Sequence, residues 1–513
     1  MCGIAAIFGE VNNKEEKLKA SLSKITHRGE YSFEYKVFDH AALGANRLAI
    51  VDEKLGMQPQ QDKNGDIFAI QSGEIFNFVN LAQKLQSLGH TLRTHNDTEV
   101  LVHLWKEYKE KTVLKLDSEM FAFVIYDKKS NEIFVARDRI GVKPLYYAFD
   151  EHKNFYLASE MKALVCLEDV KKIHEFPPGH YFYKNKFVRY FGSTTIDNKN
   201  AEEKTVQKII EESVAKRVQT DLPIAVFLSG GVDSSLIMEL ATRLHRNVTA
   251  LILGKTDSPD YISAVRLCKE KQWKYRVIEP KINYEHELAN IVYFVETYDP
   301  NIVRHSFAND IISKFAHRLG FKIVLTGEGA DEIFAGYNEF LDINKSKINL
   351  GCKMLLESMS RGNLMRIDKM AMRYTVETRC PFFDQKLVDI AMPLDSSQKV
   401  GEYNGKQYTK LILRKIALKY LPEYIALRDK FAFANGAGMN IGMNYKRGDG
   451  VLSEIAARKI SDSTFVEIQR DYSEYKLETK EEVMLFDYYR SFGYDKFIEG
   501  KERLIVKDTL YTI

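Results

Sequence analysis

The chain has 513 residues, of which 45% are hydrophobic and 12% aromatic, and its 74 Lys and Arg against 71 Asp and Glu give a net charge of +3. This length exceeds what one core supports, so we expect two globular domains. Charges of both signs are interspersed, as in the segment 106–111, which disfavours a nucleic-acid binder, and no apolar run is long enough for a membrane span. We expect small-molecule substrates.

Five cysteines are spread along the chain with no CxxC and no Cys/His metal spacing. This pattern favours a reducing compartment over a disulfide framework or a zinc site. The apolar stretch Gly3–Gly9 is shorter than the core of a signal peptide and follows no basic residue. We therefore expect a cytoplasmic protein.

The first 190 residues predict an α+β domain rich in antiparallel sheet. Helical periodicity covers Glu15–Ile25 and Val100–Tyr108, and the segment 191–204 is polar enough to predict a linker. Short apolar runs bounded by turn residues predict the strands Ile4–Phe8, Ala41–Leu43, Leu48–Val51, Ile67–Ile70, Phe121–Tyr126, Ile133–Ala136 and Phe155–Ala158.

Residues 205–445 predict a second domain in which apolar strands alternate with helices. The runs Ile224–Leu228, Val248–Leu253 and Lys322–Leu325 are continuously apolar, as strands buried on both faces are. The pattern is typical of an α/β fold with a doubly wound parallel sheet. We expect residues 446–513 to form a helical C-terminal extension.

Cys2 is a candidate nucleophile. Removal of Met1 would leave a cysteine whose own α-amine, with a pKa of about 7.7 to 8.0, can accept the thiol proton. An amino-acid substrate also needs a guanidinium for its carboxylate, carboxylates for its ammonium and N–H donors from a glycine turn for an oxyanion. Arg47, Gly73, Glu74 and Asp97 are candidates for these groups. Taken alone, a cysteine at position 2 is more simply explained by chance.

Eight segments in order resemble class II glutamine amidotransferase domains: MCGIAAIFG at the start, HRG from His27, NRLAIVD from Asn46, SGEIFN from Ser72, NDTEV from Asn96, RDRIGVKPLYY from Arg137, ASEMKAL from Ala158 and FPPG from Phe176. The resemblance implies an N-terminal-nucleophile fold, two β-sheets between helices (αββα), that hydrolyses glutamine to glutamate and ammonia. It implies catalytic roles for Cys2 and Gly73, and a glutamine pocket lined by Arg47, Ile50, Val51, Ser72, Glu74 and Asp97.

Two departures from that family's pattern bear on the glutaminase. The family usually has HRGPD where this chain has His27–Tyr31, and it usually has asparagine where this chain has Ser72. The asparagine amide is one of two oxyanion donors in the family, and losing such a donor can cost roughly a hundred- to a thousand-fold in rate. A weakened glutaminase is therefore one alternative.

Ser229–Ser235, with the sequence SGGVDSS, ends a predicted strand and opens a predicted helix. Backbone N–H groups and hydroxyls at a helix N-terminus favour the binding of anions. The segment lacks the lysine that ends the GxxxxGK(S/T) loop of enzymes that transfer a γ-phosphate. An ordinary strand-to-helix connection is the alternative. A magnesium triphosphate needs carboxylates for the metal and cations for the leaving pyrophosphate. Candidates are the carboxylates Asp233, Asp260 and Asp331 and the cations Arg304 and Lys430.

Together with LTGEGADE from Leu325, ETRCPFFD from Glu377 and RDKF from Arg428, this loop resembles the pyrophosphatase-loop domain of glutamine-hydrolysing asparagine synthetases. The resemblance implies that ATP and Mg²⁺ activate aspartate as β-aspartyl-AMP, which ammonia converts to asparagine. It implies that Glu328 assists proton removal and Lys430 stabilises the adenylation transition state. The implied ATP-binding residues are Phe227, Ser229, Gly230, Gly231, Asp233, Ser234, Leu253, Gly327 and Arg304.

Three alternatives to this interpretation stay open on the sequence. The same chemistry on a different carboxylate acceptor is one, because the acceptor pocket is the least readable part of the sequence. A catalytically silent regulator with the same fold is another, and retention of Asp233, Glu328 and Asp331 disfavours it. An ammonia-dependent synthetase with a weakened glutaminase is the third. A homodimer is common among relatives, although no residue of this chain argues for one.

Overall fold

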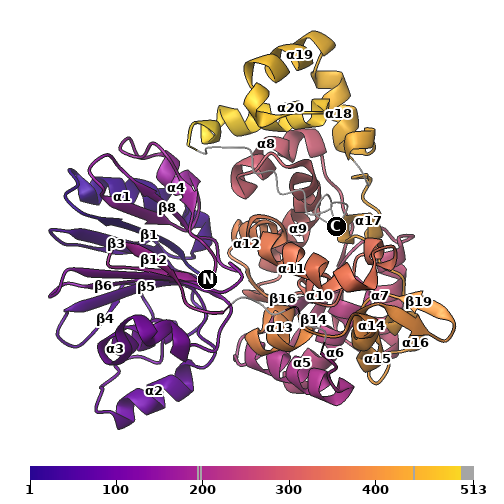
Figure 1. Ribbon diagram of the computed structural model, residues 1–513, viewed down its shortest axis with the longest axis horizontal. Coiled ribbons are helices and arrows are strands. Elements are labelled where there is room, and N and C mark those ends of the chain that lie inside the picture. The colour runs from indigo at the N-terminus through magenta and orange to yellow at the C-terminus, as the bar shows by residue number, and fades with distance from the viewer. Residues whose placement is uncertain (193–195, 197–198, 443–444, 498–513) are drawn as a thin grey trace. The chain divides into compact units, whose positions relative to one another are not determined.

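The computed structural model describes residues 1–192, 196, 199–442 and 445–497 (Figure 1). The chain divides into two compact units, the first built from residues 1–192 with short segments that begin at 372 and 493, and the second from most of the remainder. In the part of the chain that the structure describes, no helix is both long and apolar enough to cross a membrane.

The first unit contains two six-stranded sheets whose neighbouring strands run antiparallel. The first sheet has the order β10 (His174–Glu175), β8 (Tyr146–Phe149), β9 (Phe155–Ala158), β1 (Gly3–Phe8), β3 (Ala41–Asn46) and β2 (Glu34–Val37). The second has the order β12 (Lys186–Arg189), β11 (His180–Tyr183), β7 (Glu132–Arg137), β6 (Phe121–Asp127), β5 (Ile67–Gly73) and β4 (Gln60–Gln61).

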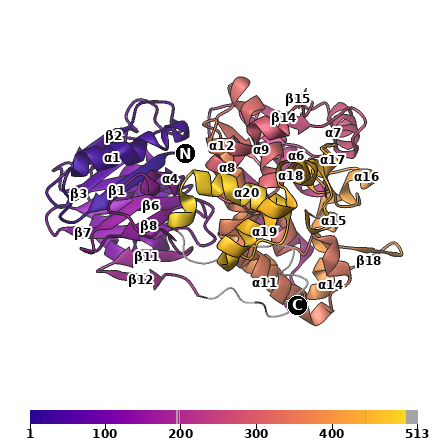
Figure 2. The ribbon, with the colours of Figure 1, turned by 90° about the horizontal axis from the view of Figure 1, so that it is seen from above.

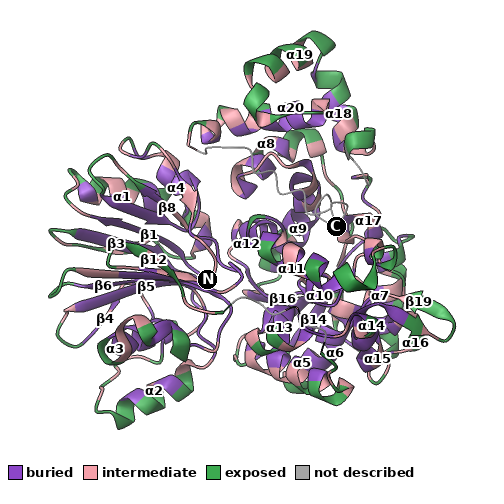
Figure 3. Ribbon diagram, viewed as in Figure 1, coloured by how far each residue is buried: buried purple, intermediate pink, exposed green. Residues whose placement is uncertain are grey.

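Side chains that alternate between the two faces of each strand explain why these sheets form layers. On β6, Ala122 and Val124 belong to the core shared with the first sheet, whereas Phe121 and Phe123 belong to the core shared with helices α2 (Phe78–Ser87) and α3 (Asp97–Tyr108). Helices α1 (Lys14–Ser23) and α4 (Lys162–Val165) contact the outer face of the first sheet. The unit is thus an αββα sandwich with two buried layers (Figure 3), which confirms the predicted fold of this half.

One predicted strand of this unit is wrong. Leu48–Val51 is a loop, because the chain curls around the guanidinium of Arg47, which donates to the carbonyls of Val51, Asp52 and Glu53. Asp52 has a φ of 50°, which turns the backbone out of an extended path. The remaining predicted runs fall within β1, β3, β5, β6, β7 and β9.

The second unit is organised around a five-stranded parallel sheet of order β15 (Tyr275–Ile278), β14 (Val248–Leu253), β13 (Ile224–Phe227), β16 (Ile323–Leu325) and β17 (Glu377–Arg379). The strand order reverses direction between β13 and β16, and right-handed crossovers then place helices on both faces. This doubly wound sheet confirms the predicted fold. Ligands bind such sheets beyond the carboxyl ends of the strands at the reversal. A ligand site is therefore expected beside the segments that follow β13 and β16.

Helices make up most of the rest of the second unit, together with one hairpin. They are α5 (Glu203–Arg217), α6 (Val232–Leu244), α7 (Pro259–Glu270), α8 (Tyr284–Val295), α9 (Pro300–Arg318), α10 (Ala330–Ile333), α11 (Ile348–Ser358), α12 (Asn363–Met372), α13 (Gln385–Ala391), α14 (Ser396–Lys399), β18 (Gly401–Tyr403), β19 (Lys406–Tyr408), α15 (Leu411–Ala417), α16 (Glu423–Ala426), α17 (Phe433–Gly436), α18 (Val451–Lys459), α19 (Asp462–Asp471) and α20 (Lys480–Ser491).

The C-terminal helices α18 and α20 pack on each other and on α8, and α20 also contacts α9 (Figure 2). A capping box between Thr479 and Glu482 begins α20. Part of the predicted linker 191–204 and residues 498–513 of the predicted extension lie outside the described residues. The three predicted boundaries between these four segments therefore stay predictions.

Candidate active sites

Cys2 precedes the central strand β1 and is buried. Its carbonyl accepts a hydrogen bond from Arg28 Nε at 3.4 Å, and Arg28 is in turn held by Glu160 at 2.7 Å. Burial raises the pKa of the Cys2 thiol, and the positive charges of the N-terminal ammonium and Arg47 act against that rise, whereas Asp97 adds to it. The structure therefore brings Cys2, Arg47 and Asp97 within electrostatic reach of one another.

The glutamine-binding candidates lie on a loop and a strand around this thiol. Val51 supplies its carbonyl to Arg47 Nη2 at 3.0 Å and to Asn96 Nδ2 at 3.2 Å, which ties the Ile50–Val51 loop to the start of α3. Asp97 is the first residue of α3, and its Oδ2 accepts from Gln71 Nε2 at 2.7 Å and from the Ile75 N–H at 3.0 Å. Glu74 is buried beside them.

Gln58 is a residue of this site that sequence reasoning missed. Its Nε2 lies 3.5 Å from Cys2 Sγ, and its Oε1 accepts from the Gln71 N–H at 2.6 Å. It thereby links the thiol to β5, the strand that carries Ser72 and Gly73. No motif of the sequence surrounds Gln58, so nothing in the pattern could have singled it out.

Ser72 and Gly73 are the last two residues of β5. The Ser72 hydroxyl is fully buried and has no hydrogen-bond partner among the described residues. Gly73 has a φ of +132°, and a Cβ at this position would lie 2.1 Å from the carbonyl oxygen of Met120. Both the backbone conformation and the close approach require glycine.

We predict that Gly73→Ala lowers the glutaminase rate by roughly a hundred- to a thousand-fold, because the clash with Met120 must displace the predicted oxyanion donor. Glutamate release measures the loss. Gly65→Ala is the matched control, because Gly65 also has a positive φ, +69°, but nothing lies within 4 Å of its added Cβ. Equal rates for the two variants would contradict the prediction.

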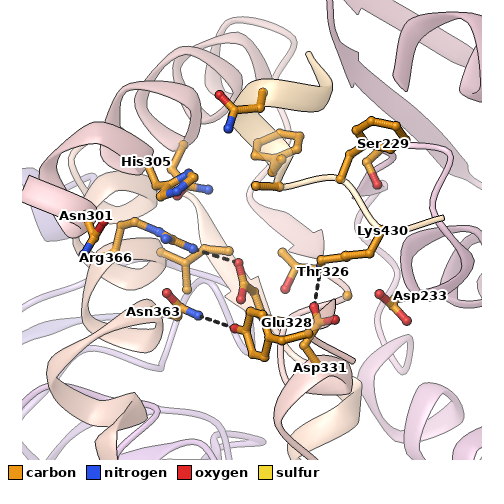
Figure 4. A pocket seen from close by; sticks show the side chains of 18 of the residues that line it. Ser229, Asp233, Asn301, His305, Thr326, Glu328, Asp331, Asn363, Arg366 and Lys430 are labelled. Carbon is orange, nitrogen blue, oxygen red and sulfur yellow. Dashed lines mark hydrogen bonds and ion pairs between the residues drawn. The ribbon is translucent and has the colours of Figure 1, made fainter. Parts of the chain in front are cut away.

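The second site is a cavity of about 300 Å³ at the reversal point of the parallel sheet. The segment after β13 contributes Ser229, Asp233 and Ser234, and the segment after β16 contributes Gly327, Glu328 and Asp331. Figure 4 shows Ser229, Asp233 and Lys430 on one side of the cavity and labelled residues of α9 and α12 on the other. The remaining lining residues are Phe227, Asn301, Ile302, Arg304, His305, Asn309, Thr326, Tyr337, Asn338, Glu339, Asn363, Arg366, Ile367, Phe431, Ala432, Phe433, Asn435 and Gly442.

Two lysines and two aspartates form a charge cluster on the wall of this cavity. Lys410 Nζ lies 2.6 Å from Asp233 Oδ2 and 2.8 Å from Asp331 Oδ1, and Lys430 Nζ lies 2.5 Å from Asp331 Oδ2. Burial alone would raise the pKa of Asp331, but the two ammonium groups outweigh it and hold the pKa well below its usual range. Asp331 is therefore ionised at neutral pH. Sequence reasoning missed Lys410, which lies in no recognisable motif.

The catalytic candidate Glu328 is paired within the cavity. Arg366 Nη2 on α12 donates to Glu328 Oε1 at 3.1 Å (Figure 4). Sequence reasoning also missed Arg366, which lies eleven residues before the segment ETRCPFFD. With Asn301, His305 and Asn309 on α9, it gives this side of the cavity a polar lining.

Glu332 lies behind this wall and is fully buried. Tyr337 donates its hydroxyl to Glu332 Oε1 at 2.5 Å, and Asn363 Nδ2 lies 3.4 Å from the same oxygen. Burial, with the nearby negative charges of Asp331 and Glu328, raises the pKa of Glu332 from 4.5 to about 7.

A carboxyl whose folded-state pKa is raised binds its proton more tightly in the folded than in the unfolded chain, so stability falls as the pH rises from about 4.5 to about 7. We predict that Glu332→Gln, which keeps the oxygen that accepts from Tyr337, raises the melting temperature at pH 8 but much less at pH 5. The gain is about 2 to 4 °C per kcal/mol recovered. Thermal unfolding at the two pH values tests this, with the exposed Glu357→Gln as control. An equal shift at both pH values would contradict it.

Four of the predicted residues, Asp260, Leu253, Gly230 and Gly231, lie away from the cavity lining. Asp260, at the start of α7, is buried and pairs with Arg428 Nη2 at 2.8 Å, while Arg428 Nη1 donates to the Ser229 carbonyl at 3.0 Å. Asp260 thus supports the loop that carries Ser229 and does not join the cluster of Asp233 and Asp331. Leu253 is fully buried at the end of β14, and Gly230 packs against α7.

The two halves of the chain match different families of known proteins. Residues 1–202 match a family model described as a glutamine amidotransferase domain, and residues 205–355 and 344–482 match one described as asparagine synthase. A probable glutamine-hydrolysing asparagine synthetase of Dictyostelium discoideum is 32% identical over 98% of this chain and 94% of its own length. Those of Sandersonia aurantiaca (32% identical, 85% of this chain and 87% of the relative) and Lotus japonicus (31%, 99% and 88%) are similar.

An N-terminal-nucleophile unit followed by a pyrophosphatase-loop unit defines the class of glutamine-dependent amidotransferases that also use ATP. Within that class, the chain belongs to the family of glutamine-hydrolysing asparagine synthetases.

Proposed function

We propose that the chain amidates L-aspartate to L-asparagine with ammonia taken from glutamine, and that it releases AMP, pyrophosphate and glutamate. The observation that carries this proposal is the cavity at the reversal of the parallel sheet, where Lys430 and the Asp233–Asp331 cluster share one lining with Glu328 and Arg366. Such a site can hold a nucleotide triphosphate on one side and a small amino-acid acceptor on the other.

In the first unit, Cys2 Sγ would attack the side-chain carbonyl carbon of glutamine. The resulting thioester forms as ammonia leaves with the thiol proton, and water then releases glutamate and restores the thiol. Gly73 would donate to the oxyanion, and Arg47, Asp97 and Glu74, with the Ile50–Val51 backbone and Ser72, would hold the substrate. The positive charges that act against the raised pKa of Cys2 support its role as nucleophile.

In the second unit, an oxygen of the aspartate β-carboxylate would attack the α-phosphorus of ATP, and the bond to the pyrophosphate oxygen breaks. Ammonia would then attack the carbonyl carbon of β-aspartyl-AMP and displace AMP. Ser229, Asp233 and Ser234, on the loop that also holds Gly230 and Gly231, would bind the phosphates, with Phe227 and Gly327 around the nucleoside. Lys430 would neutralise charge on the phosphates, and Glu328 would take the proton that ammonia loses.

Mg²⁺ is part of the proposal, and two carboxylates fit it. Asp233 Oδ1 is buried and has no hydrogen-bond partner among the described residues, and Asp331 lies across Lys410 from it. Within the described chain, no group of three or more His, Cys, Asp or Glu side chains is arranged to hold a metal alone. Phosphate oxygens would supply the other ligands, as is usual for this ion. A bound Mg²⁺ supplies charge neutralisation for the leaving pyrophosphate.

The proposal is tested by the acceptor dependence of ATP cleavage. With ammonium as nitrogen source, we expect aspartate, but not glutamate or other dicarboxylates, to give equal amounts of AMP, pyrophosphate and the amide. Pyrophosphate release that depends on another carboxylate would identify that carboxylate, and not aspartate, as the acceptor. Release of ADP and phosphate would overturn the adenylation step.

We further propose a cytoplasmic enzyme that acts on small molecules and has neither nucleic-acid nor membrane partners. Five free thiols and the interspersed charges support this placement. A homodimer is part of the same proposal, and its mass in solution tests it.

A further inference from the structure

Arg304 on α9 lines the cavity, yet its guanidinium is held from behind by the C-terminal helices. Nε donates to Glu481 Oε1 at 2.7 Å and Nη2 donates to Glu481 Oε2 at 2.5 Å, a two-point pairing that fixes the plane of the guanidinium. Both side chains are almost fully buried. Glu481 belongs to the first turn of α20, 177 residues further along the chain.

Two more residues of the C-terminal segment complete the enclosure of Arg304. Ser453 on α18 accepts from Arg304 Nη2 at 2.9 Å and donates to Glu481 Oε2 at 2.6 Å. Asp449 accepts through its carbonyl at 2.8 Å and through Oδ1 at 3.3 Å. A guanidinium has five N–H donors, so these contacts leave at most one, on Nη1, for a ligand. Arg304 therefore has no pair of free N–H groups with which to bind a pyrophosphate.

The same cluster holds the loop that closes the cavity. A Cβ on Gly442, which lines the cavity, would lie 2.4 Å from Asp449 Oδ1 and 2.8 Å from Arg304 Nη1. A Cβ on Gly450 would lie 2.4 Å from the Ile441 carbonyl. Glycine at both positions lets the end of the segment Lys430–Gly442 press against Asp449 and the guanidinium. That segment also carries Lys430 and Asn435 into the cavity.

We propose that Arg304 is a positioning residue rather than a phosphate ligand, and that Glu481, Asp449 and Ser453 clamp it so that α9 and the Lys430–Gly442 loop keep their places around the cavity. This inference rests on the proposed function for its kinetic consequences. It gives the C-terminal helices a task in the synthetase reaction, although none of their residues lines the cavity.

Hydrogen–deuterium exchange on the full-length chain tests the clamp without any turnover. Glu481→Gln keeps the size and one accepting oxygen but removes the charge that opposes Arg304. We expect exchange in residues 430–442 to become about tenfold faster and the Kd for Mg-ATP to rise about tenfold, since small displacements of positioning groups have large effects. Glu454→Gln, an exposed carboxylate one residue beyond Ser453, is the matched control and changes neither. Unchanged exchange in folded Glu481→Gln would overturn the proposal.

Kinetics of the synthetase reaction separate a positioning role from direct contact with pyrophosphate. We expect Arg304→Gln, Glu481→Gln and the double variant to raise KM for ATP by similar factors and to lower kcat less, because all three disable one clamp. A roughly hundredfold loss of kcat in Arg304→Gln with normal kinetics in Glu481→Gln would show direct contact instead and overturn the proposal. A cooperative thermal unfolding transition of the second unit in every variant reports that the altered unit is folded.

If a single substitution prevents folding, Arg304→Met with Glu481→Met removes both buried charges together, which proteins often tolerate. This pair keeps apolar packing but not the two-point geometry, so loop exchange must again accelerate if the clamp exists. Should asparagine synthesis itself prove absent, the exchange and ATP-binding results still decide the clamp, because neither needs an acceptor.

Discussion

Cys2→Ala abolishes glutamine-dependent asparagine synthesis and leaves ammonium-dependent synthesis intact. Without the thiol no thioester forms, and loss of a nucleophile of this kind costs on the order of 10⁴-fold or more in rate. The synthetase reaction draws on residues of the second unit, so we expect it to stay within about twofold of the unmodified protein. Glutamate and asparagine, measured in the same reaction with either nitrogen source, report the two activities separately.

Cys166→Ala is the control for this variant, because Cys166 is half-buried in the same unit and free of disulfides. It should retain both activities. Glutamine-dependent synthesis that survived in Cys2→Ala would contradict the assignment of the nucleophile. Very low glutaminase activity in the unmodified protein, with full ammonium-dependent activity, would instead identify Ser72 as the residue that weakens the first site.

Lys430→Met lowers synthesis from both nitrogen sources by roughly a hundred- to a thousand-fold. Lys430 lines the cavity, and removing its charge takes away the ammonium group that would lie beside the transferring phosphates (Figure 4). Asp331 keeps Lys410 at 2.8 Å, so the substitution does not leave a buried carboxylate unpaired and the fold should survive. Aspartate-dependent pyrophosphate release measures the effect.

Lys406→Met removes the same charge from an exposed lysine that pairs with Asp429 next to Lys430, and it should behave as the unmodified protein. The glutaminase should also be unchanged in both variants. If Lys430→Met released pyrophosphate at a normal rate, the charge cluster around Asp331 would be structural rather than part of ATP cleavage.

Much of the fold could be predicted because buried strands have apolar sequences. Phe121–Tyr126 and Ile224–Leu228 are apolar along their whole length, and the structure has β6 and β13 there. The strands β2 and β12 escaped prediction because they are largely exposed and carry charged residues, as strands at sheet edges do. Leu48–Val51 has an apolar sequence but is shaped by the Arg47 guanidinium, which a local pattern does not reveal.

The site could be predicted where its residues follow strands. Asp233 and Asp331 come directly after neighbouring strands of one parallel sheet, and the topology alone places them at the same edge. Lys410 could not be found this way, because its ammonium reaches Asp233 from 177 residues away through tertiary packing. Arg304 shows the converse: its charge suggested a phosphate ligand, but its partners Asp449 and Glu481 are visible only in the folded chain.

The central claim is that nitrogen from glutamine reaches aspartate on this one chain. The most direct measurement supplies glutamine labelled with ¹⁵N in its side-chain amide, together with aspartate and Mg-ATP, and follows the label by mass spectrometry. We expect labelled asparagine in amounts equal to the AMP formed, and none with Cys2→Ala. AMP formation without labelled asparagine, while unlabelled ammonium is absent, would contradict the account.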